Sequence, residues 1–335
     1  MLSKELLFRT PVGITLESRR FRVEDRYVFL GSCFSENIGG LFRQYGLSAL
    51  SNPLGVLYNP MSISGVVGQA LHPETARLPL FEHDGRWCCW LAGTQLYGDT
   101  EESCKERVGE AFARLGCALK KATCLMLTLG TPVTYILKST GQTVANCHKV
   151  PADCFTERRL DVSACTEALT AMVQDLTKVN PEIRIVFTIS PYRYAKYGFH
   201  GNQLAKATLL LAVDNVCRMH PHVCSYLPIY EIFMDELRDY RFYASDMLHP
   251  NEIAVDYIWH RLKTDCMDDR MQQYLVEAEP VRKFLLHRPS EPHSAKYQEQ
   301  VQKNNTRIKE LREKYGVPAA DSFVEQAWHT GNTNY

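Results

Sequence analysis

The fold is decided by one stretch, residues 27–39, which reads YVFLGSCFSENIG. Residues with a strong strand preference lead to a glycine, and small residues that open a helical pattern follow it. Three further apolar runs lie at 124–129, 183–189 and 223–227. Each run is continuously apolar rather than alternating, which is typical of a parallel strand that is covered on both faces. We therefore expect a parallel sheet buried between two layers.

Helical patterns separate these strands. Apolar residues recur at helical spacing over 101–120, 163–178 and 202–219. Strands that alternate with helices predict right-handed crossovers and a doubly wound sheet, so the fold class is α/β.

Two segments read as β-hairpins inserted beside the sheet. Residues 81–90 turn at Asp84-Gly85, and residues 133–144 turn at Thr140-Gly141. We expect one domain over 20–265 and a helical C-terminal extension over 266–335. Within this extension, 291–335 is predicted to form a peripheral helix and a loose tail, which would serve as a packing arm in a homo-oligomer.

Composition excludes several classes of partner. Lys+Arg and Asp+Glu both number 38, so the net charge is zero, which argues against nucleic acid and acidic membrane surfaces as partners. No apolar run approaches the ~18 residues of a spanning helix, and the first residues lack the apolar core of a signal peptide. A cytoplasmic protein is expected. The 12 cysteines contain no C-x-x-C pair and are interpreted as reduced core residues, so neither a metal nor another cofactor is expected.

The turn after the first strand is the strongest candidate for chemistry. In an open α/β sheet, sites lie beyond the carboxyl ends of the strands. The helix that begins there presents free N–H groups and the positive end of its dipole, which stabilise a thiolate or an oxyanion. Cys33 is thus a candidate nucleophile. The alternative makes Ser32 or Cys33 a helix cap without a catalytic role.

A second candidate lies late in the chain. Asp246 precedes His249 by three residues in one loop, and Pro250 follows. A carboxylate at this spacing can bind one ring nitrogen of the histidine and leave the other to act as a base. The alternative is an ordinary surface turn.

Together, the early GSCFS (31–35) and the late D-x-x-H-P (246–250) resemble the SGNH (GDSL-like) hydrolase superfamily, and most closely the GSCFA-domain family within it. The resemblance covers roughly residues 20–265. Further segments that look familial are NPLGVLYNP (52–60), Gly130-Thr131, NCHK (146–149), Ser190-Pro191 and NQLAK (202–206).

The resemblance implies a three-layer α/β/α fold with a flavodoxin-like parallel sheet, and ester hydrolysis through a covalent acyl intermediate. Overlay of Gly-Asp-Ser-Leu on residues 31–34 puts Cys33 at the nucleophile position, with Ser32 as the alternative nucleophile. His249 would be the general base and Asp246 would orient it. The oxyanion hole would use the Cys33 N–H and that of Gly55.

The chain departs from the superfamily pattern at one position of the oxyanion hole. SGNH hydrolases supply an asparagine from Gly-x-Asn-Asp, where this chain reads Gly130-Thr131-Pro132-Val133. The Thr131 hydroxyl, Asn146 or His148 is the candidate replacement.

Substrate-binding residues are expected near this site. His148 is one candidate, and Asn202 and Lys206 share a helix face because they are four residues apart. The run 191–197, PYRYAKY, has aromatic and cationic groups suited to a sugar or an anion.

The leading hypothesis is an acyl hydrolase (esterase) that removes a small acyl group, such as acetyl, from a carbohydrate or another alcohol. An acyltransferase would use the same site. A non-catalytic binding protein on the same fold is the third hypothesis, favoured by the missing asparagine.

Overall fold

The computed structural model describes residues 10–16, 20–287 and 294–318, and its core is a five-stranded parallel sheet. The order across the sheet is β10-β9-β5-β1-β2, so β1 lies between β2 and β5, the next two strands of this sheet along the chain. This is the strand order of flavodoxin-like folds, and the predicted α/β class is confirmed. The strands are β1 (Tyr27–Gly31), β2 (Ala49–Ser51), β5 (Cys124–Leu129), β9 (Arg184–Ile189) and β10 (Cys224–Tyr226).

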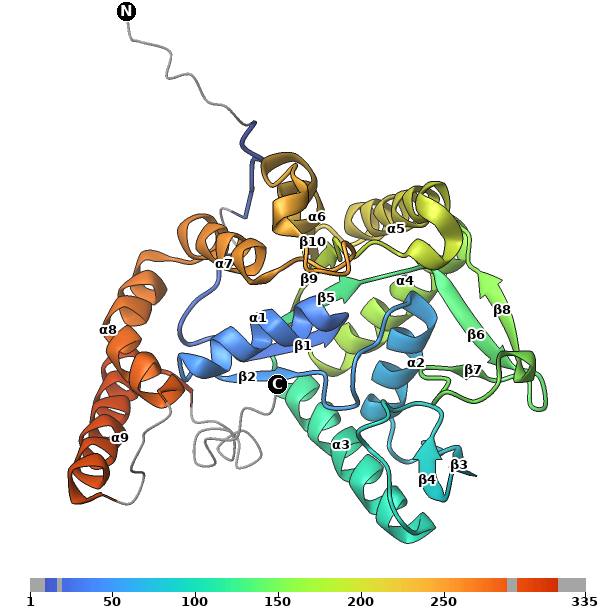
Figure 1. The fold of residues 1–335 in the computed structure, drawn as a ribbon, viewed down its shortest axis with the longest axis horizontal. Helices are drawn as coiled ribbons and strands as arrows, with labels where there is room; N and C mark the ends of the chain where they lie inside the picture. The colour runs from blue at the N-terminus through green and yellow to red at the C-terminus, as the bar shows by residue number, and fades with distance from the viewer. Residues whose placement is uncertain (1–9, 17–19, 288–293, 319–335) are drawn as a thin grey trace, which may run out of the picture.

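Helices cover both faces of this sheet (Figure 1). Successive residues of β5 point to opposite faces, so Leu125 and Leu127 join one hydrophobic core while Cys124 and Met126 join the other. Both faces are therefore apolar, which explains the continuous apolar runs. The first core is covered by α2 (Pro60–Leu71), α3 (Glu101–Lys121), α4 (Val162–Val179) and α5 (Gly198–Met219). The second is covered by α1 (Cys33–Gln44), α6 (Ile229–Glu231), α7 (Glu252–Arg261) and α8 (Asp269–Leu286).

Two small antiparallel sheets lie beside the main one, as the hairpin signals predicted. The strands β3 (Leu80–His83) and β4 (Arg86–Cys89) join through Asp84 and Gly85, both at the positive φ that such two-residue turns require. The second sheet has the order β7-β6-β8. It consists of β6 (Val133–Leu137), β7 (Thr143–Val144) and β8 (Phe155–Arg159).

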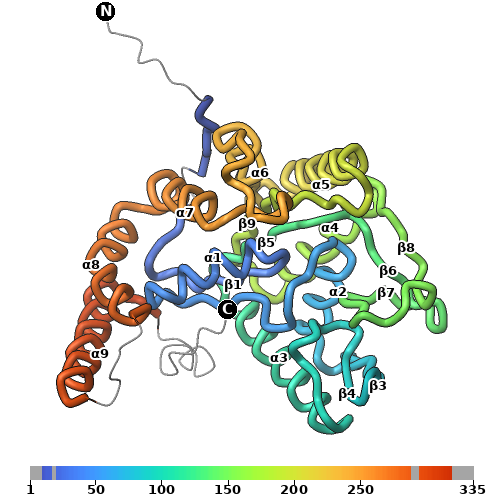
Figure 2. The backbone as a smooth tube through the Cα atoms, viewed as in Figure 1, coloured from blue at the N-terminus to red at the C-terminus, as the bar shows by residue number. Residues whose placement is uncertain are grey.

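The C-terminal helices stack at the opposite end of the molecule. Figure 2 shows α8 beside α9 (Ala295–Tyr315), away from the small sheets. The Tyr274 hydroxyl of α8 donates to the Tyr45 carbonyl at the end of α1, at 2.6 Å. The expected tail after residue 318 lies outside the described residues, and the domain division at 265 stays a prediction.

Two further features concern the helices and the cysteines. None of the helices within the described ranges is both long and apolar enough to cross a bilayer. No disulfide bond joins the cysteines, all of which the structure describes, and those that are exposed are Cys33, Cys117 and Cys154.

Candidate active site

Cys33 is the first residue of α1, directly beyond the carboxyl end of β1. The preceding Gly31 has φ 130°, and a Cβ there would lie 2.1 Å from the backbone oxygen of Thr128 in β5. Only glycine fits so close to the neighbouring strand. The turn therefore brings the start of α1 tightly against the sheet and leaves the Cys33 side chain exposed.

Ser32 occupies the capping position instead. Its side chain accepts a hydrogen bond from the Phe34 N–H at 3.3 Å, and the residue is only 4% exposed. Ser35 is also buried, with its hydroxyl donating to the Leu30 carbonyl at 2.9 Å. Of the small polar residues in this turn, Cys33 is the exposed one, and its N–H donates to no group among the described residues.

Asp246 and His249 form the contact that their spacing suggested. Oδ2 of Asp246 lies 2.5 Å from Nδ1 of His249, and Oδ1 accepts from the backbone N–H groups of Leu248 and His249. These backbone bonds, then the imidazole contact, lower the pKa of Asp246 to about 2. The carboxylate is thus ionised at neutral pH and holds the Nδ1 proton, which leaves Nε2 as the basic nitrogen.

The loop that carries His249 is anchored from the next segment of the rim. The Arg193 N–H donates to the Leu248 carbonyl at 3.2 Å, and its guanidinium donates to the Met247 carbonyl at 3.1 Å. The ring of Tyr192 lies against the imidazole, with 4.3 Å between centroids. The imidazole of His249 is therefore held by both its loop and an aromatic neighbour.

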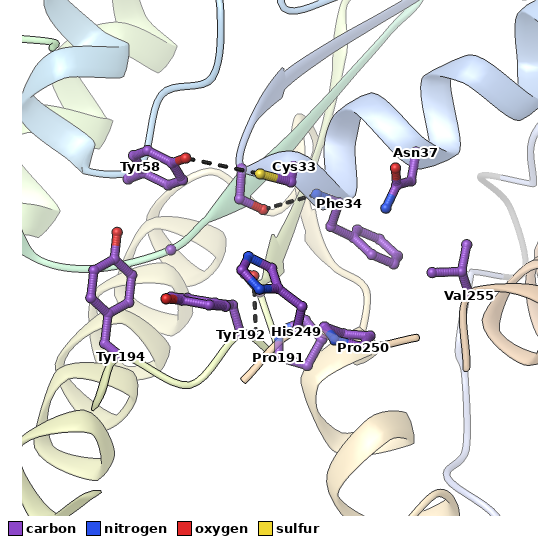
Figure 3. Close-up of a pocket in the computed structure, with 13 residues that line it drawn as sticks. Cys33, Phe34, Asn37, Tyr58, Pro191, Tyr192, Tyr194, His249, Pro250 and Val255 are labelled. Carbon is purple, nitrogen blue, oxygen red and sulfur yellow. Dashed lines mark hydrogen bonds between the residues drawn. The ribbon is translucent and has the colours of Figure 1, made fainter. Parts of the chain in front are cut away.

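One cavity of about 290 Å³ brings the two signals together (Figure 3). It opens beyond the ends of β1, β5 and β9, where the strand order of such sheets reverses and ligands commonly bind. Figure 3 shows the His249 ring pointing toward the turn that carries Cys33. No hydrogen bond joins the two side chains in the described part of the chain, and in enzymes without substrate such contacts are often long. The lining residues are Ser32, Cys33, Phe34, Asn37, Tyr58, Gly130, Ser190, Pro191, Tyr192, Tyr194, His249, Pro250 and Val255.

Two residues predicted for the oxyanion hole, Gly55 through its N–H and Thr131 through its hydroxyl, make hydrogen bonds within their own loops. The Gly55 N–H donates to the Asn52 carbonyl at 2.8 Å, and the Thr131 N–H donates to the Tyr58 carbonyl at 3.0 Å. The Thr131 hydroxyl accepts from the Val133 N–H at 3.2 Å. Neither Gly55 nor Thr131 is among the lining residues.

The two candidates from 146–149, Asn146 and His148, are not among the residues that line the cavity. Asn146 Oδ1 accepts from the His148 N–H at 2.7 Å, and His148 Nε2 lies 2.9 Å from the Cys89 carbonyl oxygen. Burial lowers the pKa of His148, whose ring packs edge-on against Phe81 and Trp90. Their assigned roles in an oxyanion hole or in substrate binding stay predictions.

Asn202 and Lys206 are not among the residues that line the cavity, but both bind residues that do. The fully buried ammonium of Lys206 donates to the carbonyls of Gly130, at 2.8 Å, and Ser190, at 2.7 Å. Asn202 Oδ1 accepts from the Tyr194 N–H at 2.9 Å. Both residues hold backbone that lines the cavity, and their proposed contact with substrate stays a prediction.

Two residues that were not predicted as site residues, Tyr58 and Asn37, also line the cavity. Tyr58 points its hydroxyl at Cys33, with 3.9 Å between oxygen and sulfur (Figure 3). Asn37 follows Cys33 by four residues on α1 and lines the same cavity. The i, i+4 spacing was a usable signal for Asn37. Tyr58 lies in the segment 52–60, which looked familial, but no pattern indicated that its side chain faces Cys33.

Comparison with family sequence models agrees with the family resemblance. The sequence model of the GSCFA family matches residues 26–262. No curated protein matches the chain. One solved structure with similarity is an acetyl xylan esterase, Est2A, from the rumen bacterium Butyrivibrio proteoclasticus, at 15% identity and a TM-score of 0.24. The match covers 42% of this chain and 37% of that one, so it spans well under half of the esterase.

Proposed function

We propose that this chain, which belongs to the GSCFA family, is an acyl hydrolase that uses Cys33 as its nucleophile and His249 as its general base. The observation that carries the proposal is the shared cavity. An exposed thiol at a helix N-terminus and an imidazole held by a carboxylate line the same space. A nucleophile, a base and an orienting group are the parts that covalent acyl transfer needs.

The reaction follows from these positions. His249 Nε2 takes the proton of the Cys33 thiol as the sulfur attacks the ester carbonyl carbon, and a tetrahedral oxyanion forms. The carbon–oxygen bond to the alcohol then breaks, and the imidazolium returns its proton to the departing oxygen. Water attacks the resulting thioester, again losing a proton to His249. The carbon–sulfur bond breaks, which releases the acid and restores the thiol.

Ser32 is the less suited nucleophile. Its side chain is bound as the cap of α1, and attack by its oxygen would remove the acceptor that satisfies the Phe34 N–H. Cys33, one residue later, is exposed to the cavity.

The lining favours a neutral substrate. None of the described residues that line the cavity is Lys, Arg, Asp or Glu. Much of the lining is formed by the aromatic and proline side chains of Phe34, Tyr58, Pro191, Tyr192 and Tyr194. Tyrosine rings combine apolar faces with hydroxyls, which suits a sugar or another alcohol that carries a small acyl group. We therefore propose an uncharged ester, such as an acetylated carbohydrate, as the substrate class.

Transfer of the acyl group to a second alcohol is the alternative use of this site. The apolar part of the lining favours it, because a lining that orders little water slows hydrolysis of the thioester. Product analysis with and without an added alcohol acceptor separates the two reactions.

Acyl trapping tests the proposal. Purified protein is mixed with p-nitrophenyl acetate, quenched in acid, and analysed by intact mass and peptide mapping. The expected result is one acetyl group on Cys33, with exposed Cys117 and Cys154 as internal controls. Acetyl on Ser32 would move the nucleophile by one residue. Labelling of Cys33 no faster than of Cys117 would contradict the proposal and favour a binding protein.

A further inference from the structure

We propose that the Tyr58 hydroxyl donates a hydrogen bond to the oxyanion that forms when Cys33 attacks, and that it completes an oxyanion hole with the Cys33 N–H. This inference rests on the proposed acyl transfer at Cys33. It assigns a catalytic role to a residue outside the superfamily pattern, in place of the missing asparagine. Tyr58 keeps its proton throughout, because it donates a hydrogen bond and transfers no atom.

Few backbone N–H groups near Cys33 are available to an oxyanion. A tetrahedral oxyanion is stabilised by donors already aimed at it, and most backbone N–H groups around this cavity are committed elsewhere. The Gly130 and Thr131 N–H groups both donate to the Tyr58 carbonyl, at 2.8 and 3.0 Å. The Phe34 N–H is bound to the Ser32 side chain. Within the described residues of this turn, the Cys33 N–H has no acceptor and is available.

The Tyr58 hydroxyl is placed where it can reach the oxygen of an attacked carbonyl. It lies 3.9 Å from the Cys33 sulfur and faces the cavity (Figure 3). The oxygen of an attacked carbonyl is bonded to the carbon that the sulfur joins. A donor at this distance from the sulfur can therefore approach that oxygen within the ~2.7–3.1 Å that oxyanion donors require.

The Tyr58 phenol keeps its proton at neutral pH. Burial, followed by the neighbouring Cys33 side chain, raises the pKa of Tyr58 above its ordinary value. The phenol is therefore a donor rather than a phenolate at neutral pH, as a group that faces a developing negative charge must be.

Tyr58 is held in place by its neighbours, which matters because oxyanion donors stabilise the charge only when they are positioned beforehand. The Tyr58 carbonyl receives two hydrogen bonds from the residues that follow β5, and Lys206 holds the Gly130 carbonyl in turn. The Tyr58 ring also packs edge-on against Tyr194, with 6.5 Å between centroids. The backbone and the ring of Tyr58 are thus both restrained.

Asn37 is the competing donor. Its amide lines the same cavity and makes no hydrogen bond within the described residues, but the side chain is exposed and lacks such restraints. We favour Tyr58 on this difference, and the experiment includes Asn37 for this reason.

The test compares two reactions of the same thiol. Acylation of Cys33 by p-nitrophenyl acetate passes through an oxyanion, whereas alkylation by iodoacetamide occurs at a saturated carbon and forms none. For Tyr58→Phe, which keeps the ring, we expect acylation to slow by ~10²–10³-fold, the loss typical of one missing oxyanion donor. Alkylation should stay within about twofold of wild type. Tyr97→Phe is the matched control, since Tyr97 packs against Arg86 outside the cavity.

Each other outcome overturns the inference in a recognisable way. Equal slowing of both reactions would mean that Tyr58 acts on the thiol itself. Unchanged acylation in Tyr58→Phe, or a selective loss in Asn37→Ala alone, would remove Tyr58 from the oxyanion hole while leaving the proposed function standing. If wild-type Cys33 is not acylated at all, the proposed function fails, and the role of Tyr58 fails with it.

Discussion

Replacement of Lys206 by methionine should change how stability depends on pH. The lysine is 1% exposed, and burial lowers its pKa to about 7. Its ordinary value in an unfolded chain is near 10.4, so between these values the unfolded state binds more protons than the folded state. The free energy of unfolding must therefore rise with pH across this window. The stability cost is fully present below pH 7 and is relieved as pH approaches 10.

The size of the effect follows from the two pKa values. Between pH 7 and pH 9, this single group should raise the free energy of unfolding by ~2 kcal/mol. Lys206→Met removes that dependence, but it also leaves the Gly130 and Ser190 carbonyls without their donor, at ~1–3 kcal/mol for each buried group. The absolute stability of the variant thus combines opposing effects, while the pH dependence isolates the lysine.

The assay is urea unfolding of wild type and Lys206→Met at pH 7 and pH 9, with matched ionic strength. Other titrating groups, the cysteines among them, cancel in the difference between the two proteins. We expect wild type to gain ~2 kcal/mol more than the variant between the two pH values. An equal change in both proteins would refute the argument, because it would mean that the buried lysine does not titrate near 7.

Three further predictions concern the turn, the base and a helix cap. Gly31→Ala should lower the free energy of unfolding by at least ~2 kcal/mol, because the new Cβ would lie 2.1 Å from a backbone oxygen of β5. Gly40→Ala, in the interior of α1, should instead stabilise by ~0.5–1 kcal/mol; equal effects in thermal unfolding would contradict the packing argument. Asp246→Asn should slow acylation ~10²-fold in stopped-flow measurements, because an amide does not hold the His249 proton as a carboxylate does; an unchanged rate would remove the orienting role. Asn59→Ala removes the side chain that caps α2 and should cost ~1 kcal/mol in urea unfolding, whereas no loss would show that the cap contributes nothing.

Much of the fold follows from the sequence because parallel strands carry a strong local signal. The continuous apolar run at 124–129 became β5 with the same bounds, and the helical spacing at 101–120 became α3 almost unchanged. The short edge strand β2 was not predicted, since three residues show no periodicity. Strand β8 was missed because Thr156, Glu157 and the arginines after it are exposed, so it lacks an apolar pattern.

The candidate site could be predicted where its interacting residues lie close together in the sequence. Asp246 and His249 lie in one tight loop, so their spacing alone suggested the observed contact. Contacts between distant segments were harder to predict. The assignment of Gly55 required knowledge of where its N–H points, and the loop directs it to the Asn52 carbonyl. Lys206 was expected to face a ligand. Its position on the helix shows that it shares a face with Asn202, but it does not show that the Gly130 and Ser190 carbonyls accept its hydrogen bonds.

Cys33 and His249 are proposed to act together, the thiol as the nucleophile and the imidazole as the base that takes its proton. The most direct test is the ratio of Cys33 to Cys117 acetylation rates at pH 7, measured by peptide mapping in wild type and in His249→Ala. Cys117 lies on the exposed face of α3 and reports the reactivity of an ordinary thiol in the same molecule. We predict that the ratio falls by ~10²-fold or more in the variant, the contribution of a general base. A ratio that is the same in both proteins would contradict the claim.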